Sequence, residues 1–458
     1  MTEKRLFGTD GIRGHIDSPA FQRNNVLRLG HVIGKVIINR QHDEELAIAQ
    51  NCTVVIGRDT RASGLYLEQT LIEGITTQGV DCELVGILPT SAVAHFTKKS
   101  GAALGIMISA SHNRFHDNGF KLFDPLGFKI SERLEALIEE QYALKSHTEN
   151  SKGGVVRTKS NMHVDYGQAI AKCISRTGKA KRLRVVIDCA HGSASSLVPE
   201  MFAEQDVDVT VIGANPDGGN INLGFGSEHP ETLKQEVIKQ NADLGIAFDG
   251  DADRVVFVDD HGQAIDGDAV LAVMARDLQK TGRLAKNTLV ATVMSSAALD
   301  HALISENITV LRTEVGDKFV VRKMKDEGYT FGGENSGHLI LFPEVTTGDG
   351  IFSSILFLDI LQRAQMPASS LINFYKPMPK LLRNIEVTNK IPLEHMPNTQ
   401  NLIASANHWL KSLGRVLMRY SGTENKVRLL VEAPSAEECH RIANSISAEF
   451  LREKDQHR

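Results

Sequence analysis

The sequence predicts an α/β protein of three related domains with mixed sheets, followed by a smaller C-terminal α+β domain. One segment type recurs three times, as a strand, a polar turn, a helix, a strand, a further stretch and then an apolar strand that ends in a polar loop. The pattern changes after two prolines near residue 378, where three strands precede one helix. With 458 residues, the chain is also too long for a single core.

In the first copy, continuous apolar runs indicate buried strands, and apolar residues on one helical face indicate a helix. The predicted elements are a strand at Cys52–Gly57, a helix with Leu67, Leu71 and Ile75 on one face, and strands at Val80–Leu88 and Ala102–Ile108. The polar residues Ser109–Asn113, here called the serine loop, follow the last strand. Just beyond them, Asp117–Gly119 consists of turn-forming residues and predicts a turn.

The second and third copies repeat this order with different residues. Strands are predicted at Leu183–Asp188, Val207–Ile212 and Leu244–Phe248, and then at Thr288–Val293, Thr309–Thr313 and Tyr329–Phe331. The helical faces carry Leu197, Val198, Met201 and Phe202 in the second copy and Leu299 and Leu303 in the third. Apolar strands alternating with helices are typical of parallel or mixed sheets covered on both faces. Ligands bind such sheets at the carboxyl ends of strands, where the loops Asp249–Arg254 and Gly333–His338 lie.

Changes in composition divide the chain into four predicted domains: residues 1–153, 154–254, 255–372 and 373–458. The polar segment Ala143–Lys159 predicts an exposed boundary, and Tyr375–Pro379 predicts a linker. In the last domain, strands are expected at Leu381–Val387, Arg415–Arg419 and Val427–Val431, and a helix with Cys439, Ile442, Ile446 and Phe450 on one face.

Composition narrows the possible functions. The contents of 41% hydrophobic and 23% charged residues are ordinary for a globular protein, and a net charge of −5 argues against nucleic-acid binding. The five cysteines are scattered and form no Cys-x-x-Cys pair, which suits reduced thiols. The N-terminus has no signal-like apolar core, and the longest apolar run, Ile351–Leu361, is too short to span a bilayer. A cytoplasmic protein without nucleic-acid or membrane partners is therefore expected.

Three aspartates, Asp249, Asp251 and Asp253, alternate with small residues directly after an apolar strand. Carboxylates about 4 Å apart repel one another by roughly 4 kcal/mol per pair at an effective dielectric constant near 20. A divalent cation removes this repulsion, and oxygen ligands select Mg²⁺ or Ca²⁺. Arg254 stands where a calcium-binding EF-hand needs glycine, and few protein ligands suit Mg²⁺. An acidic turn without a metal is the alternative.

Ser111 in the serine loop is a candidate nucleophile, although its neighbours are also turn formers. No Gly-x-Ser-x-Gly elbow surrounds it, and His112 cannot be assumed to be its base, because adjacent side chains generally point apart. A metal-bound phosphoserine fits better, since its phosphate would supply oxygen ligands. Lys121, further along, can reach toward an anion.

Two further loops carry binding chemistry. In the first, a permissive glycine, two hydroxyls and two guanidinium groups suit a phosphate dianion; these residues are Arg419, Ser421, Gly422, Thr423 and Arg428. An ordinary hairpin turn is the alternative. In the second, Glu334 and Ser336 pair an acceptor with a donor, as recognition of vicinal sugar hydroxyls requires. For His338 a substrate contact, an acid/base group and a structural role all remain open.

The sequence resembles the α-D-phosphohexomutase superfamily along essentially the whole chain. The resemblance lies in the motifs Phe7–Gly14, Ser109–Asn113 with Asp117–Gly119, Asp249–Arg254, Glu334–His338 and Arg419–Asn425. Within the superfamily, the chain is most similar to bacterial members that act on glucosamine phosphates. Walker, zinc and dinucleotide motifs, which would indicate other chemistries, are not found.

The resemblance implies four domains around a central cleft and an enzyme that is phosphorylated on Ser111. This phosphoserine would convert glucosamine 6-phosphate into a 1,6-bisphosphate, which reorients and leaves as glucosamine 1-phosphate. Mg²⁺ would bind Ser111 and the three aspartates. Arg13, Lys121, Arg254 and His338 would be catalytic, and the Glu334 and Arg419 loops would bind a hexosamine phosphate. Glucosamine or glucose 1,6-bisphosphate as activator and a homodimer are also expected.

Two residues depart from the usual family pattern. Arg114 follows the serine loop and Asn425 follows Glu424, where the family usually has proline. Three alternative functions therefore remain: a mutase for glucose or mannose phosphates, a metal-dependent phosphatase, and a non-catalytic phosphosugar-binding protein.

Overall fold

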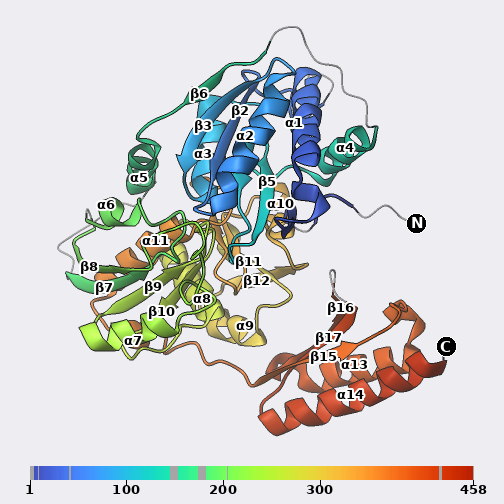
Figure 1. Cartoon of the computed structure of the whole chain (residues 1–458). Helices are drawn as coiled ribbons and strands as arrows, with labels where there is room; N and C mark the ends of the chain where they lie inside the picture. Colours follow the sequence, from blue (N-terminus) through green and yellow to red (C-terminus); the bar gives the residue numbers. More distant parts are fainter. Residues whose placement is uncertain are drawn as a thin grey trace. The chain divides into compact units, whose positions relative to one another are not determined.

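The computed structural model describes residues 5–8, 10–40, 43–144, 153–173, 182–203, 205–421 and 425–456. The chain forms two compact units. Unit 1 consists of Met1–Thr292 and Leu311–Ile372, and unit 2 of Val293–Val310 and Asn373–Arg458. Four sheets with their helices confirm the predicted succession of three mixed α/β domains and one α+β domain (Figure 1). The four predicted domain boundaries stay predictions.

The first sheet has six strands in the order β1-β5-β4-β2-β3-β6. The strands are β1 (Ile12–His15), β2 (Thr53–Arg58), β3 (Asp81–Ile87), β4 (Leu104–Ile108), β5 (Asp117–Phe123) and β6 (Val156–Thr158). The helices are α1 (Arg23–Ile38), α2 (Ala62–Thr76), α3 (Thr90–Ser100) and α4 (Glu132–Ala143). Helices α1 and α2 lie side by side (Figure 1), because glycines let their backbones approach. A Cβ atom on Gly30 would lie 2.4 Å from the carbonyl oxygen of Leu71.

Two predictions for this domain are wrong. Asp117–Gly119 does not form a turn; it begins β5, which pairs with both β1 and β4. A Cβ atom on Gly119 would lie 2.5 Å from the oxygen of Ile12 and 2.6 Å from that of Ser109, so close strand approach explains this glycine. Within the expected boundary segment Ala143–Lys159, Val156–Thr158 forms β6 and pairs with β3. In both places, pairing within the sheet overrides local propensity.

The second sheet has the order β10-β9-β7-β8. Its strands are β7 (Leu183–Asp188), β8 (Val207–Ile212), β9 (Leu244–Phe248) and β10 (Val255–Val258), and its helices are α5 (Met162–Cys173), α6 (Val198–Ala203) and α7 (Glu231–Gln240). The three strands predicted from apolar runs are confirmed. Strand β10 runs antiparallel to β9, so the residues Asp249–Arg254, here called the acid loop, join two neighbouring strands.

The third sheet has the order β12-β11-β13-β14. Its strands are β11 (Thr288–Thr292), β12 (Thr309–Thr313), β13 (Phe331–Gly333) and β14 (Leu339–Leu341). The accompanying helices are α8 (Gly267–Lys280), α9 (Ala297–Ile304), α10 (Asp317–Glu327), α11 (Gly350–Ala364) and α12 (Ala368–Leu371). The long apolar run Ile351–Leu361 is the buried helix α11. Of the helices described, none combines the length and the apolar character needed to cross a membrane.

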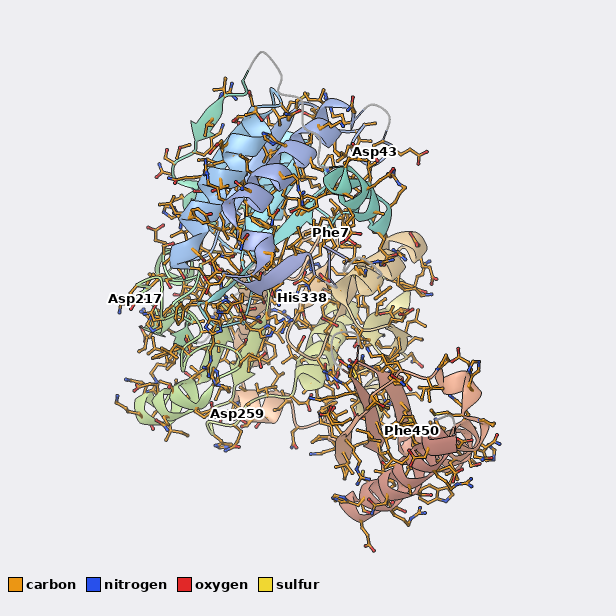
Figure 2. All side chains as sticks on the ribbon, turned by 45° about the vertical axis from the view of Figure 1, so that its right-hand side comes forward. Phe7, Asp43, Asp217, Asp259, His338 and Phe450 are labelled. Carbon is orange, nitrogen blue, oxygen red and sulfur yellow. The ribbon has the colours of Figure 1, made fainter. Side chains whose placement is uncertain are left out.

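Unit 2 contains an antiparallel sheet in the order β15-β17-β16. Its strands are β15 (Lys380–Glu386), β16 (Arg415–Tyr420) and β17 (Lys426–Glu432), and its larger helices are α13 (Pro397–Leu410) and α14 (Ala436–Gln456). The predicted helical face is confirmed, since Cys439, Ile442, Ile446 and Phe450 are buried in one apolar core. Phe450, on α14, is labelled in Figure 2.

Candidate active site

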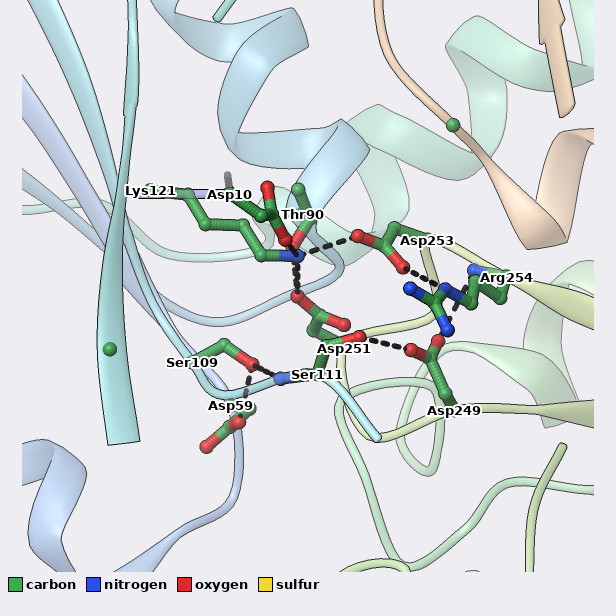
Figure 3. A network of polar contacts seen from close by, with 12 residues as sticks. Asp10, Asp59, Thr90, Ser109, Ser111, Lys121, Asp249, Asp251, Asp253 and Arg254 are labelled. Atoms are coloured by element: carbon green, nitrogen blue, oxygen red, sulfur yellow. Dashed lines mark hydrogen bonds and ion pairs between the residues drawn. The ribbon is translucent and has the colours of Figure 1, made fainter. Parts of the chain in front are cut away.

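Ser111 lies at the end of β4, buried against the acid loop. Its side chain is fully buried, and its backbone has a φ of 53°, which is uncommon for a residue other than glycine. The Ser111 hydroxyl donates a hydrogen bond of 2.5 Å to Oδ2 of Asp249, 138 residues further along the chain (Figure 3). The candidate nucleophile and the first aspartate of the acid loop therefore meet.

A buried arginine fixes the backbone of the serine loop. The guanidinium of Arg61, just after β2, donates to the carbonyl oxygens of Ser111 at 3.0 Å and Asn113 at 2.7 Å, and also to that of Arg114. Its Nε is 2.9 Å from Oδ2 of Asp59, and both side chains of this ion pair are fully buried. One planar group thus holds three consecutive turns of backbone direction in place.

Further side chains complete this support from two domains. The Ser109 hydroxyl donates to Asp59 at 2.7 Å and accepts from the backbone N–H of Ser111 at 2.9 Å. The amide of Asn222, in the second domain, donates to the carbonyl oxygens of Ser111 and Asn113, both at 2.8 Å. Sequence reasoning missed these roles. The available signal was the polar segment Arg58–Arg61, which leaves the carboxyl end of a predicted strand.

The acid loop brings its three aspartates together as predicted. Asp249, Asp251 and Asp253 are buried, and one carboxylate oxygen from each lies within 4.8 Å of the others. The intervening Gly250 is required by packing, because a Cβ atom there would lie 2.7 Å from the carbonyl oxygen of Ser111. This close approach presses the acid loop against the serine loop.

Lys121 and Thr90 hold the last two aspartates of the loop. The Lys121 ammonium, on β5, lies 2.7 Å from Asp251 and 2.5 Å from Asp253 (Figure 3). The Thr90 hydroxyl, at the start of α3, donates to Asp251 at 2.5 Å. Burial disfavours the charged ammonium, but the charges of Asp10, Asp251 and Asp253 outweigh it and raise the pKa of Lys121 well above its ordinary value. Lys121 is therefore a permanent cation beside the cluster.

The remaining carboxylate chemistry fits a divalent cation. Burial, together with the charges of Asp253 and Asp251, raises the pKa of Asp249 well above its ordinary value, so this carboxyl tends to keep a proton. The buried Oδ1 atoms of Asp251 and Asp253 make no hydrogen bond within the described residues. A cation with hard oxygen ligands would displace the proton and use these oxygens. The three aspartates could therefore bind a metal.

The two predicted arginines lie on either side of the cluster. Arg13, on β1, forms an ion pair of 2.9 Å with Asp10, which also contacts Lys129 and lies 3.6 Å from Lys121. The backbone N–H of Arg254 donates to Asp249 at 3.2 Å, and its guanidinium Nε lies 4.0 Å from Asp253. Asp10, which sequence reasoning missed, connects three cations of the first domain.

His338 joins the third domain to the acid loop. It is buried, its Nδ1 lies 3.8 Å from Asp253 and its Nε2 lies 3.2 Å from Asp317 (Figure 2). The Gly348 N–H, 2.9 Å from the same Nε2, instead favours an unprotonated nitrogen. Burial also opposes the charged form, yet the two carboxylates outweigh it and raise the pKa of His338 to about 10. A protonated imidazole beside the cluster is favoured.

The residues Glu334–His338, here called the glutamate loop, connect β13 and β14. Backbone hydrogen bonds shape the loop: Glu334 N–H donates to the His338 oxygen at 2.9 Å, and Gly337 N–H donates to the Glu334 oxygen at 3.0 Å. Glu334 also accepts from the Gly316 N–H at 3.1 Å, whereas Ser336 is exposed. The structure thus brings His338 to the aspartates and leaves Ser336 at the loop surface.

In unit 2, the predicted phosphate-binding residues lie on two paired strands. Arg419 on β16 and Arg428 on β17 are direct partners in the register. Burial and the neighbouring charge of Arg428 lower the pKa of Arg419. The Ser421 N–H donates to the Lys426 oxygen at 2.8 Å, and Gly422 and Thr423 lie outside the described residues. Adjacent guanidinium groups favour a bound anion.

Comparison with known proteins identifies the family. Four domain profiles of the phosphoglucomutase/phosphomannomutase family match the chain: α/β/α domain I at residues 4–149, domain II at 163–262, domain III at 266–378 and the C-terminal domain at 382–449. The chain belongs to this family of enzymes. The superfamily resemblance deduced from the motifs is therefore confirmed.

Individual family members extend this result. The chain is 41% identical to a phosphoglucosamine mutase of Anaeromyxobacter dehalogenans, over 98% of both chains, and 43% identical to one of Rhodopseudomonas palustris, over 94% of both. A solved family protein from Burkholderia thailandensis has the same fold, with a TM-score of 0.81 and 23% identity over 99% of this chain and 98% of that one. Aspergillus fumigatus N-acetylphosphoglucosamine mutase, solved with GlcNAc-6P and magnesium, gives 0.66 and 17% over 98% and 96%.

Proposed function

We propose that the protein is a phosphoglucosamine mutase, which interconverts glucosamine 6-phosphate and glucosamine 1-phosphate. The observation that carries the proposal is the contact of 2.5 Å between Ser111 and Asp249 within the aspartate cluster. It occurs in a chain at least 40% identical to several phosphoglucosamine mutases along nearly its whole length. The product would be a precursor for the synthesis of amino-sugar nucleotides and cell-wall material.

In the proposed reaction, Ser111 carries a phosphoryl group at the start. The bond between phosphorus and the serine oxygen breaks as the sugar O1 attacks, and the hydroxyl proton leaves, which gives glucosamine 1,6-bisphosphate. After this intermediate turns around, the phosphoryl group on O6 returns to Ser111, and the O6 oxygen takes up a proton. Glucosamine 1-phosphate then leaves the phosphorylated enzyme.

The residues around Ser111 would carry this reaction as follows. Asp249, Asp251 and Asp253, with the phosphorylated Ser111, would hold Mg²⁺, which supplies positive charge to the transferring group. Lys121, Arg13 and Arg254 would stabilise the same charge through their own cations. His338 would hold or release a proton at Nε2, where Asp317 and the Gly348 N–H favour opposite protonation states.

Substrate recognition is assigned to the two outer loops. Glu334 and Ser336 would bind sugar hydroxyls as acceptor and donor. Arg419, Ser421 and Arg428, with Gly422 and Thr423, would bind the phosphate that is not being transferred, because paired guanidinium groups and hydroxyls suit a dianion. Glucosamine or glucose 1,6-bisphosphate would activate the enzyme by phosphorylating Ser111. A homodimer, a cytoplasmic location and the lack of nucleic-acid partners stay predictions.

A substrate comparison with phosphate analysis tests the proposal. The purified protein, supplied with Mg²⁺ and glucose 1,6-bisphosphate, would be assayed with the 6-phosphates of glucosamine, glucose and mannose. We expect the highest kcat/KM with glucosamine 6-phosphate and one phosphate on Ser111 by peptide mass spectrometry. Equal or faster conversion of glucose or mannose phosphates would reject the proposed substrate. Release of inorganic phosphate faster than isomerisation would instead indicate a phosphatase.

A further inference from the structure

A large cavity in unit 1 contains none of the residues assigned to the reaction. Its volume is about 900 Å³, and its walls come from α3, α5, α8, α11 and the segment after β14. Pockets of roughly 300 to 1,000 Å³ are typical of sites for small molecules. The cavity is therefore large enough for a ligand of considerably greater size than one phosphate group.

The charges of the cavity lining favour an anion. Arg283 is paired with Glu344 at 2.6 Å, and Arg363 is paired with Asp277 at 2.8 Å. The remaining lining cations, Lys98, Lys99 and Lys172, form no ion pair in the described part of the chain. The lining thus has surplus positive charge in a protein whose net charge is −5. Several ammonium groups near one another suit a multiply charged phosphate.

Other lining groups favour a ligand with both polar and apolar parts. The buried Nε2 of His95 and Oε2 of Glu344 have no hydrogen-bond partner within the described residues. Burial, with the nearby charges of Lys99 and Lys98, lowers the pKa of His95 to about 4, so its imidazole is neutral at neutral pH. Buried polar groups normally find partners, so these two atoms can accept or donate hydrogen bonds to a ligand. An apolar wall is supplied by Ile170, Val345, Phe352 and Leu356.

The floor of the cavity is connected to the acid loop. The Tyr166 hydroxyl lies 2.7 Å from Ser91 and donates to the carboxylate of Asp349. Next to Asp349, the Gly350 N–H donates to the oxygen of Ala252 in the acid loop at 2.9 Å. Next to Ser91, Thr90 donates to Asp251. A ligand that contacts Ser91 or Tyr166 would therefore be one residue away from groups that hold the acid loop.

We propose that this cavity is a regulatory site for a nucleoside diphosphate. The diphosphate would bind Lys98, Lys99 and Lys172, and hydroxyl or N–H groups of the nucleoside would bind His95 and Glu344. The planar base would pack against the apolar wall, and the bound molecule would alter the affinity of the acid loop for its cation. This site is separate from the proposed reaction, so its presence can be tested whatever the substrate is.

Calorimetric titration of the metal-loaded, phosphorylated protein with ADP and UDP, at constant free Mg²⁺, tests the site directly. We expect one of the two to bind, and the double variant Lys98→Glu/Lys172→Glu to bind it at least tenfold more weakly. Lys35→Glu/Lys239→Glu is the matched control, because it reverses the same charges in the last turns of α1 and α7. Lack of binding by the unaltered protein, or equal weakening in both double variants, would overturn the proposal.

Thiol protection gives a second measurement that needs no variant. Cys173 lines the cavity, whereas Cys52, also partly accessible, lies in the first domain outside the cavity lining. The saturating nucleotide should slow alkylation of Cys173 at least threefold and leave that of Cys52 unchanged. It should also shift the apparent Mg²⁺ constant at least twofold. An unchanged rate at Cys173 rejects the site, and an unchanged Mg²⁺ constant rejects its regulatory role.

Discussion

The serine loop and the glutamate loop both leave the carboxyl ends of strands in unit 1, but different groups hold them. The serine loop is fixed by buried side chains from two domains, namely Arg61, Asp59 and Asn222. The glutamate loop is shaped mainly by its own backbone hydrogen bonds, and Ser336 remains exposed at its surface. A reacting atom must be held in one position, whereas a recognition group must be accessible to its ligand.

The difference implies separate consequences for substitutions in the two loops. Changes around Ser111 remove either the reacting atom or buried ion pairs, so they should affect catalysis and stability strongly. Changes in the glutamate loop remove accessible hydrogen-bonding groups, so they should affect substrate binding and leave the fold intact. Four substitutions or treatments test this contrast.

Replacement of the proposed nucleophile should have the largest effect. Ser111→Ala removes the oxygen that would carry the phosphoryl group, so we expect kcat to fall roughly 10⁴-fold and peptide phosphorylation to disappear. Ser336→Ala, which deletes a hydroxyl from the glutamate loop, should retain activity within about tenfold. A Ser111→Ala protein with substantial mutase activity would show that another group carries the phosphate.

Metal binding should link the acid loop to overall stability. A cation at one hundred times its Kd stabilises the folded state by about 2.7 kcal/mol. Mg²⁺ should therefore raise the unfolding temperature of the unaltered protein and of Glu334→Gln, but not that of Asp249→Asn. Removal of Mg²⁺ by EDTA should abolish activity reversibly. If Asp249→Asn is stabilised by Mg²⁺ as much as the unaltered protein, the cation binds elsewhere.

The buried ion pair behind the serine loop can be compared with one at the surface. Arg61→Met leaves Asp59 as a buried, unpaired carboxylate and should lower the free energy of unfolding by about 3 to 5 kcal/mol. Arg23→Met breaks a pair with Glu73 in which both side chains are about half exposed, and should cost under about 1 kcal/mol. Urea unfolding measures both values.

A conservative variant separates positioning from stability at the same residue. Arg61→Lys keeps the charge beside Asp59 but cannot reach three carbonyl oxygens with one planar group. We expect a stability close to that of the unaltered protein and a kcat lowered by about tenfold or more, with an unchanged KM. An unaltered kcat in Arg61→Lys would mean that the three carbonyl contacts do not position Ser111.

The sequence was sufficient for the contents of both loops because their residues are contiguous. Apolar runs located β4 and β9, and the polar residues after them identified Ser111 and the aspartates. Loops at the same edge of neighbouring sheets then had to be close together, as the contact between Ser111 and Asp249 confirms. His338 was located in the same way, although its pairing with Asp317 was not predicted.

The supports of these loops could not be predicted, because they depend on contacts between distant segments. Arg61 reaches the serine loop across 50 residues of sequence and Asn222 across 111, and neither spacing leaves a local pattern. The turn expected at Asp117–Gly119 was wrong for the same reason, since pairing of Gly119 with Arg13 decides its conformation. Local propensity describes single segments, whereas these residues respond to partners in three dimensions.

The smallest predicted effect concerns the glutamate loop. Glu334→Gln keeps an oxygen that can accept from the Gly316 N–H, so the loop should retain its shape. Loss of the charge weakens a hydrogen bond to a sugar hydroxyl by about 1.5 kcal/mol, so KM should rise roughly tenfold while kcat and the unfolding temperature stay the same. Glu327→Gln, an exposed substitution at the end of α10, serves as control. A lower kcat with unchanged KM would place Glu334 in the chemical step, and the contrast between the two loops would then no longer hold.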